Sequence, residues 1–190
     1  WVNPSSLADW QVIYSRVTGV DYTKRVIIQA SGSGLGGNDE FYISVANGTS
    51  YGAYTQADIL QAGVWTHFAL VFDGSQPDDA TRLKFYVNGV LQTLTFTGSS
   101  GQVPTNVHTA SESATIASEN NIAYFSGYID ELSFWTSART QSQVRSMMCR
   151  SLSGDETGLQ AYYRFDASSG TTAYDHSLSG RHGTLVNLTF

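Results

Sequence analysis

Cysteine, proline, charge and long apolar runs are all scarce in this chain of 190 residues. The single cysteine, Cys149, cannot form an internal disulfide. It falls in an amphipathic stretch, so we expect its thiol to be buried and inert. Only 14% of the residues are charged, the net charge is −6, and no Lys/Arg cluster occurs. These features argue against nucleic-acid binding and against an anionic membrane surface as partner. No apolar run has the length that membrane insertion needs.

What the chain has in plenty is strand-forming sequence. Aromatic residues make up 13% of it, with 11 Tyr and 9 Phe. Short runs of β-branched and aromatic residues alternate with turns rich in Gly and Ser, a pattern typical of antiparallel β-proteins. Asn88-Gly89 is a strong two-residue hairpin signal. The expected strands include Gln11–Val17, Arg25–Ala30, Glu40–Val45, Val64–Gly74, Arg82–Val87, Val90–Phe96, Phe125–Trp135 and Leu159–Phe165.

One helix is predicted, from Gln141 to Met148. Thr140 and Gln143 can form a capping box in front of an apolar stripe at helical spacing. The whole pattern predicts an all-β fold, a two-sheet antiparallel β-sandwich or jelly roll with one short peripheral helix. We expect residues 1–190 to form a single domain. Because Trp1 stands in mid-strand, we expect this domain to have neighbouring domains in a larger polypeptide.

Asp130 is the polar residue of most interest in the Phe125–Trp135 segment. In a continuous strand it shares a face with Tyr128, Leu132 and Phe134, while Glu131 points to the opposite face. A carboxylate among apolar neighbours needs a cation or several N–H donors to stay charged. Calcium is one candidate cation. A hydrogen-bonded or ion-paired structural carboxylate is the alternative.

Three segments resemble the laminin-G-like, concanavalin A-like jelly rolls, especially the bacterial laminin-G-3 type. Gly63–Gly74 is similar to the family's Gly-x-Trp-x-His strand, and Leu83–Val90 to its Tyr-Val-Asn-Gly hairpin. Phe125–Thr140 is similar to its Phe-x-Gly-x-Ile-Asp-Glu strand and the helix start that follows. The order and spacing of these motifs agree over nearly the whole chain.

The resemblance implies a secreted or cell-surface domain that binds a glycan or an extracellular protein. Relatives often hold calcium, and the aspartate matching Asp130 is a frequent ligand. Because calcium takes six to eight oxygens, further ligands are needed, and we expect them in the glycine-rich loop Ser31–Asp39, with Asn38 and Asp39, or in the N-terminal region. Such a site is structural by default.

Sugar recognition favours an aromatic side chain beside amide and carboxylate groups. The loop Asn47–Asp58, with Tyr51 and Tyr54, has this chemistry, and so does Trp10 with Asp9. Glu119, Asn120 and Asn121 are further ligand-binding candidates. Packing of an aromatic loop on a sheet edge explains the Asn47–Asp58 residues equally well. An ordinary polar turn explains Glu119, Asn120 and Asn121 equally well.

Catalysis is not expected, although related jelly rolls include glycoside hydrolases. Those enzymes carry paired carboxylates in a Glu-x-Asp-x-Glu or Glu-x-Asp-x-x-Glu strand, and this spacing is missing here. The sequence therefore predicts a non-catalytic, calcium-stabilised, glycan-binding module. The alternative is a protein-binding adhesion or spacer module.

Overall fold

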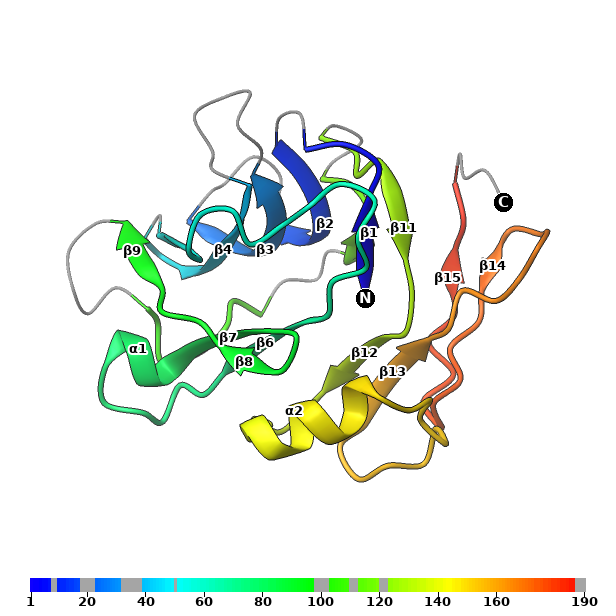
Figure 1. Cartoon of the computed structure of the whole chain (residues 1–190). Coiled ribbons are helices and arrows are strands. Elements are labelled where there is room, and N and C mark those ends of the chain that lie inside the picture. Colours follow the sequence, from blue (N-terminus) through cyan, green and yellow to red (C-terminus); the bar gives the residue numbers. More distant parts are fainter. Residues whose placement is uncertain are drawn as a thin grey trace.

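The computed structural model describes residues 1–7, 10–17, 23–31, 39–49, 51–97, 103–109, 113–119 and 123–186. Within these ranges the chain is built mainly of short antiparallel strands, with two helices (Figure 1). The elements are β1 (Val2–Pro4), β2 (Trp10–Val17), β3 (Lys24–Ser31), β4 (Glu40–Asn47), β5 (Gly52–Tyr54), β6 (Phe68–Phe72), α1 (Asp79–Arg82), β7 (Leu83–Val87), β8 (Val90–Leu91), β9 (Thr95–Thr97), β10 (Thr115–Ile116), β11 (Gly127–Ile129), β12 (Leu132–Trp135), α2 (Gln141–Met148), β13 (Leu159–Tyr163), β14 (Thr172–Ala173) and β15 (Gly183–Thr184).

The upper layer in Figure 1 is one six-stranded antiparallel sheet with the order β10-β2-β3-β4-β5-β9. Its longest strands alternate apolar and polar residues, so one face is apolar. On β4 the apolar set is Phe41, Ile43 and Val45, and all three belong to the hydrophobic core. This alternation fixes the register of β3 and β4, since a slip by one residue would turn the apolar set outward.

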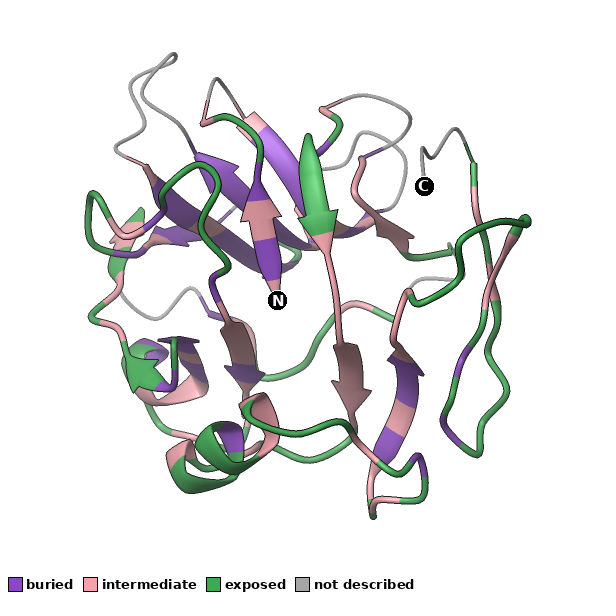
Figure 2. Cartoon of the chain, turned by 45° about the vertical axis from the view of Figure 1, so that its right-hand side comes forward, coloured by how far each residue is buried: buried purple, intermediate pink, exposed green. Residues whose placement is uncertain are grey.

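The lower layer consists of three separate pieces: the sheet β6-β7-β8 and the pairs β1-β11 and β12-β13. β1 also bridges to Thr66, just before β6, so it lies between the two halves of this layer. Figure 2 shows most of the six-stranded sheet as buried, whereas β6 and β12 are largely intermediate. The pair β14-β15 lies to one side.

The core lies between the layers and is rich in aromatic contacts. Phe41 of the upper layer meets Phe68 and Phe85 of the lower layer, with ring centroids 5.5 and 4.9 Å apart. Phe41 and Phe85 are fully buried. The expected two-sheet antiparallel β-sandwich is therefore confirmed.

Helix α2 is confirmed with the predicted bounds and capping box, in which Thr140 and Gln143 exchange hydrogen bonds. Its one buried residue, Val144, packs on Val71 and Tyr86, on the outside of the β6-β7 sheet. Cys149, in contrast, is exposed, so the expectation of a buried thiol was wrong. The reason is that Cys149 is the C-cap of α2 and lies beyond the buried turn.

The predicted continuous strand Phe125–Trp135 was also wrong. It is two strands, β11 and β12, which pair with β1 and β13 respectively. Glu131, between them, has a φ of +52°, in the left-handed region. This residue interrupts the two-residue alternation of side chains. The expectation that Asp130 shares a face with Tyr128, Leu132 and Phe134 is therefore overturned.

Three smaller differences concern element bounds. Val90–Phe96 divides into β8 and the start of β9, which belong to different sheets, and the Val64–Gly74 strand is regular only over Phe68–Phe72. The one-turn helix α1, capped by Asp78, was not predicted. In the part of the chain that the structure describes, neither helix is long and apolar enough to cross a bilayer.

Candidate functional site

The six-stranded sheet has a second face, turned away from the core, that is unusually polar. We call it the polar face. Its strand residues include Arg25, Gln29 and Ser31 of β3 and Glu40 and Ser44 of β4, each of which is at most 8% exposed. Buried charged and amide groups are costly unless they have polar partners. Arg25 has such partners in Tyr42 and Ser44, and the partly exposed side chains beside these buried groups are aromatic.

Three aromatic side chains stand together on the polar face. Trp10 lies edge-on to Tyr42 and Tyr54, with ring centroids 5.5 and 6.4 Å apart. Tyr42 and Tyr54 are register partners on β4 and β5, and their ring centroids are 5.0 Å apart. All three are partly exposed. Glu40 belongs to the same region, since it pairs in register with Ser31, which pairs with Trp10.

Tyr42 is held in place from two sides. The Arg25 guanidinium donates a 2.7 Å hydrogen bond to its hydroxyl group, and a second one, 3.1 Å long, to Ser44 Oγ. On the other side the Tyr42 ring lies across Gly52, where a Cβ atom would stand only 2.3 Å from ring atom Cε2. Glycine at position 52 therefore lets the ring lie close against β5. The aromatic group is rigid before any ligand arrives, which lowers the entropic cost of binding.

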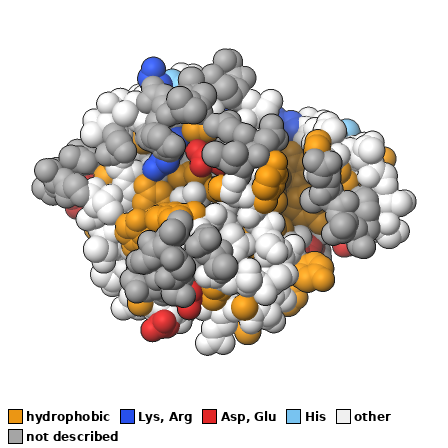
Figure 3. Space-filling model, turned by 90° about the horizontal axis from the view of Figure 1, so that it is seen from above, with side chains coloured by type: hydrophobic (Ala, Val, Ile, Leu, Met, Phe, Trp, Pro, Cys, Tyr) orange, Lys and Arg blue, Asp and Glu red, His pale blue; other side chains and the backbone are white. Residues whose placement is uncertain are grey.

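The electrostatics agree with this arrangement. Burial raises the pKa of the Tyr54 hydroxyl above its ordinary value, and the nearby Tyr42 and Glu40 add to the shift. Arg25 acts in the opposite direction. Tyr54 thus stays a neutral hydrogen-bond donor, close to one acidic and one basic group. Figure 3 looks down on this layer and shows hydrophobic side chains, a class that includes Tyr and Trp, next to Lys or Arg and Asp or Glu side chains.

The ligand-binding candidates from the sequence are scattered. Tyr54 is part of the aromatic group, but Tyr51 is 2% exposed and stacks on Phe96 inside the core. Glu119 is buried just beyond β10, the strand at the far edge of the same sheet from β9. Asn120 and Asn121 lie outside the described residues.

The metal candidates fall on different sheets. Asp39 immediately precedes β4, and its Oδ1 is buried without a hydrogen-bond partner among the described residues. Asp130 follows β11, where its Oδ1 accepts a 2.8 Å hydrogen bond from the Glu131 N–H. Burial raises the pKa of the Asp130 carboxyl. Asn38 lies outside the described residues. Among the described residues no three His, Cys, Asp or Glu side chains form a group that could hold a metal ion.

Sequence analysis had singled out Trp10 and Tyr54 but had missed Arg25, Glu40 and Tyr42. The signal was present in β4, where Glu40, Tyr42 and Ser44 alternate with three apolar residues. Recognising it as a site required the register of β3, β4 and β5, which brings these residues beside Trp10.

The comparison with known families agrees with this fold. Residues 1–145 match the laminin-G-3 family, which is described as the concanavalin A-like lectin/glucanases superfamily. The match spans more than half of the chain. The chain therefore belongs to this family of concanavalin A-like β-sandwiches. A search of the curated proteins gives no significant match.

One similar solved structure is the crystal structure of a Bacteroides ovatus protein whose proposed role is carbohydrate binding. It superposes with a TM-score of 0.71 at 21% sequence identity. The aligned region covers 97% of this chain and 52% of the other, so this chain spans about half the length of that protein. At this level of identity the likeness shows a shared fold.

Proposed function

We propose that this domain binds carbohydrate on its polar face and catalyses no reaction. The observation that carries the proposal is the group formed by Trp10, Tyr42 and Tyr54 beside the buried Arg25 and Glu40. Aromatic rings pack on the apolar C–H faces of a sugar, while guanidinium and carboxylate groups hydrogen-bond its hydroxyls. Membership of a family that includes lectins, and the likeness to a protein of proposed carbohydrate-binding role, support the same ligand class.

The number of carboxylates supports binding without catalysis. Hydrolysis of a glycosidic bond by the common mechanisms requires two carboxyl groups flanking the scissile bond. Among the described strand residues that point outward from the six-stranded sheet, Glu40 is the one carboxylate. Glu40 is therefore assigned to ligand hydrogen bonding.

The test is a glycan array followed by calorimetric titration of each bound glycan. Tyr54→Ala should weaken binding by about tenfold or more, since it removes one aromatic surface. Gly52→Ala is the sharper variant, because its methyl group displaces the Tyr42 ring while every side chain of the aromatic group is kept. Tyr128→Ala is the matched control, since Tyr128 is 67% exposed but lies on β11 of the other layer. A folded protein that binds no glycan, or equal losses for Tyr54→Ala and Tyr128→Ala, would contradict the proposal.

We further propose a structural calcium ion at Asp39. Support comes from its buried Oδ1, which has no hydrogen-bond partner among the described residues. Asp39 is also well fixed, since its carbonyl oxygen accepts hydrogen bonds from the N–H groups of Ile59 and Leu60. Asp130 fits a metal less well, because the Glu131 N–H already occupies its Oδ1 and the Trp1 amino group lies against its carbonyl oxygen.

Thermal unfolding in millimolar calcium and in chelator tests this second proposal. We expect calcium to raise the melting temperature of the natural chain and of Asp130→Asn, and to leave that of Asp39→Asn unchanged. A calcium effect lost in Asp130→Asn but retained in Asp39→Asn would reassign the site. No effect in the natural chain would remove it.

A further inference from the structure

The three rings of the aromatic group on the polar face do not lie in one plane. The Trp10 ring makes angles of 84° with Tyr42 and 63° with Tyr54, and the two tyrosine rings make an angle of 53° with each other. A flat, insoluble polysaccharide surface can stack on several rings at once only if those rings are coplanar. Rings at these angles can instead pack on successive sugars of one flexible chain. The aromatic group therefore fits a single sugar chain better than a crystalline surface.

One carboxylate lies beside the aromatic group. Glu40 and Tyr42 are two residues apart on β4, so their side chains project from the same face of the sheet. Glu40 is 7% exposed. After burial and Tyr42, Glu40 is the next cause of the raised pKa of the Tyr54 hydroxyl, so its negative charge reaches the aromatic group. A ligand carboxylate or sulfate placed on these rings would therefore meet a like charge where water screens it poorly.

The cation of the polar face is already engaged by the protein. Arg25 is the one Lys or Arg among the described strand residues that point outward from the six-stranded sheet. Its Nε donates a hydrogen bond to Ser44 Oγ, and its Nη2 donates one to the Tyr42 hydroxyl group. This edge of a guanidinium is one that could hold a carboxylate by two parallel hydrogen bonds. Arg25 therefore positions Tyr42 and Ser44, and that edge is not open to an anion.

Uncharged polar groups flank the two tyrosines. Gln29 pairs in register with Tyr42, and Thr95 pairs in register with Tyr54, so an amide and a hydroxyl group lie next to the rings. Amides and hydroxyls both donate and accept hydrogen bonds, and a sugar hydroxyl does the same. Carboxylate and sulfate oxygens only accept. The net charge of −6 adds a longer-range repulsion against any polyanion.

We infer that the polar face binds a single, uncharged sugar chain and rejects both anionic glycans and flat crystalline polysaccharide. This inference rests on the proposed carbohydrate-binding function and adds which glycans the site selects. Glu40 sets the selectivity, because it accepts hydrogen bonds from sugar hydroxyls and repels a carboxylate or a sulfate in the same place. Specificity then comes from a repulsive element as well as from attractive contacts.

The test for charge uses pairs of ligands that differ only at C6 of the sugar. Neutral oligosaccharides of glucose, mannose and galactose that bind on the glycan array are titrated by calorimetry beside the same oligosaccharides oxidised at C6 to carboxylates. We expect the neutral form to bind about tenfold or more tightly than the oxidised form at low salt. This preference should fall as salt is added, because screening weakens the repulsion.

Glu40→Gln is the decisive variant, since it keeps the size of the side chain and its hydrogen bonding but removes its charge. We expect it to reduce the preference for the neutral ligand by about tenfold. Asp155→Asn is the matched control, because it removes the same charge from an exposed segment before β13, in the other layer. This control should leave the preference unchanged. Circular dichroism checks that both variants are folded.

Sedimentation with insoluble polysaccharide tests the form of the ligand. Microcrystalline cellulose and crystalline chitin present flat arrays of chains. We expect both to leave the protein in the supernatant, even where the matching soluble oligosaccharide binds.

The outcomes distinguish this inference from the proposed function. Equal or tighter binding of the oxidised ligands, an unchanged preference in Glu40→Gln, or retention by a crystalline surface would overturn the inference and leave carbohydrate binding in place. Folded protein that binds neither neutral nor anionic glycans would instead overturn the proposed function itself.

Discussion

The two layers of this sandwich differ in burial more than their sequences suggest. β6 is Phe-Ala-Leu-Val-Phe, yet only one of its five residues, Val71, is buried. β3 is Lys-Arg-Val-Ile-Ile-Gln-Ala-Ser, and six of its eight residues are buried, polar ones included. The difference is one of pairing: among the described strands β3 has a partner on both sides, whereas β6 pairs with β7 alone. Burial in a sheet thus depends on completed neighbours as well as on the hydrophobicity of each strand.

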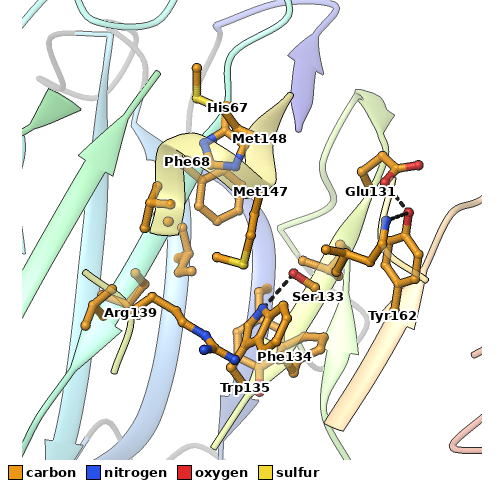
Figure 4. Close-up of a pocket in the computed structure, with 18 of the residues that line it drawn as sticks. His67, Phe68, Glu131, Ser133, Phe134, Trp135, Arg139, Met147, Met148 and Tyr162 are labelled. Carbon is orange, nitrogen blue, oxygen red and sulfur yellow. Dashed lines mark hydrogen bonds between the residues drawn. The ribbon is translucent and has the colours of Figure 1, made fainter. Parts of the chain in front are cut away.

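The largest expected effect contrasts a phenylalanine of each layer. Phe41 is fully buried and meets both Phe68 and Phe85, so Phe41→Ala should cost about 3 to 5 kcal/mol of the free energy of unfolding. Phe134 of β12 is partly exposed, lines a cavity of about 740 Å³ between β6 and β12 (Figure 4), and contacts Tyr14 and Tyr163. Phe134→Ala should cost about 1 to 2 kcal/mol, since the cavity already leaves part of the ring uncovered. Denaturant unfolding of both variants measures the two costs. The comparison of layers fails if both variants lose the same stability.

Local chemistry accounts for the parts of the fold that sequence predicted well. The bounds of α2 followed from Thr140, Gln143 and one apolar stripe, and the β7-β8 turn followed from Asn88-Gly89. The Phe125–Trp135 strand was predicted wrongly because its break is not encoded locally. Glu131 takes a left-handed conformation at the point where the chain stops pairing with β1 and begins to pair with β13. Nearly all of the residues paired in β1 and β13 are more than 25 positions away in the sequence.

The candidate site was predictable to a smaller extent. Trp10 and Tyr54 stood out as aromatic residues near polar ones, but Tyr51 has the same local surroundings and points into the core. The direction of each ring depends on strand register, which a single sequence does not supply. Arg25 shows the same limit, since its role is to fix Tyr42 on the neighbouring strand.

The smallest expected effect is the dependence of stability on pH above about pH 7.5, at the end of the lower layer where β1 begins. In protein prepared with Trp1 as its first residue, the amino group has a pKa of about 6 when folded and about 8 when unfolded. Between these values the unfolded chain binds the extra proton, so stability should rise with pH, by about 2 kcal/mol from pH 6 to pH 8, of which about 0.4 kcal/mol falls above pH 7.5. His67 has its pKa lowered from 6.5 to about 4 by burial, so its own contribution is nearly complete by about pH 7.5. The rise from about pH 7.5 to 8 therefore belongs to the amino group, and urea unfolding of N-acetylated protein should show none of it. If the acetylated protein keeps the full rise, the Trp1 amino group is well solvated in the folded protein, and its position at this end of the lower layer costs no folding free energy.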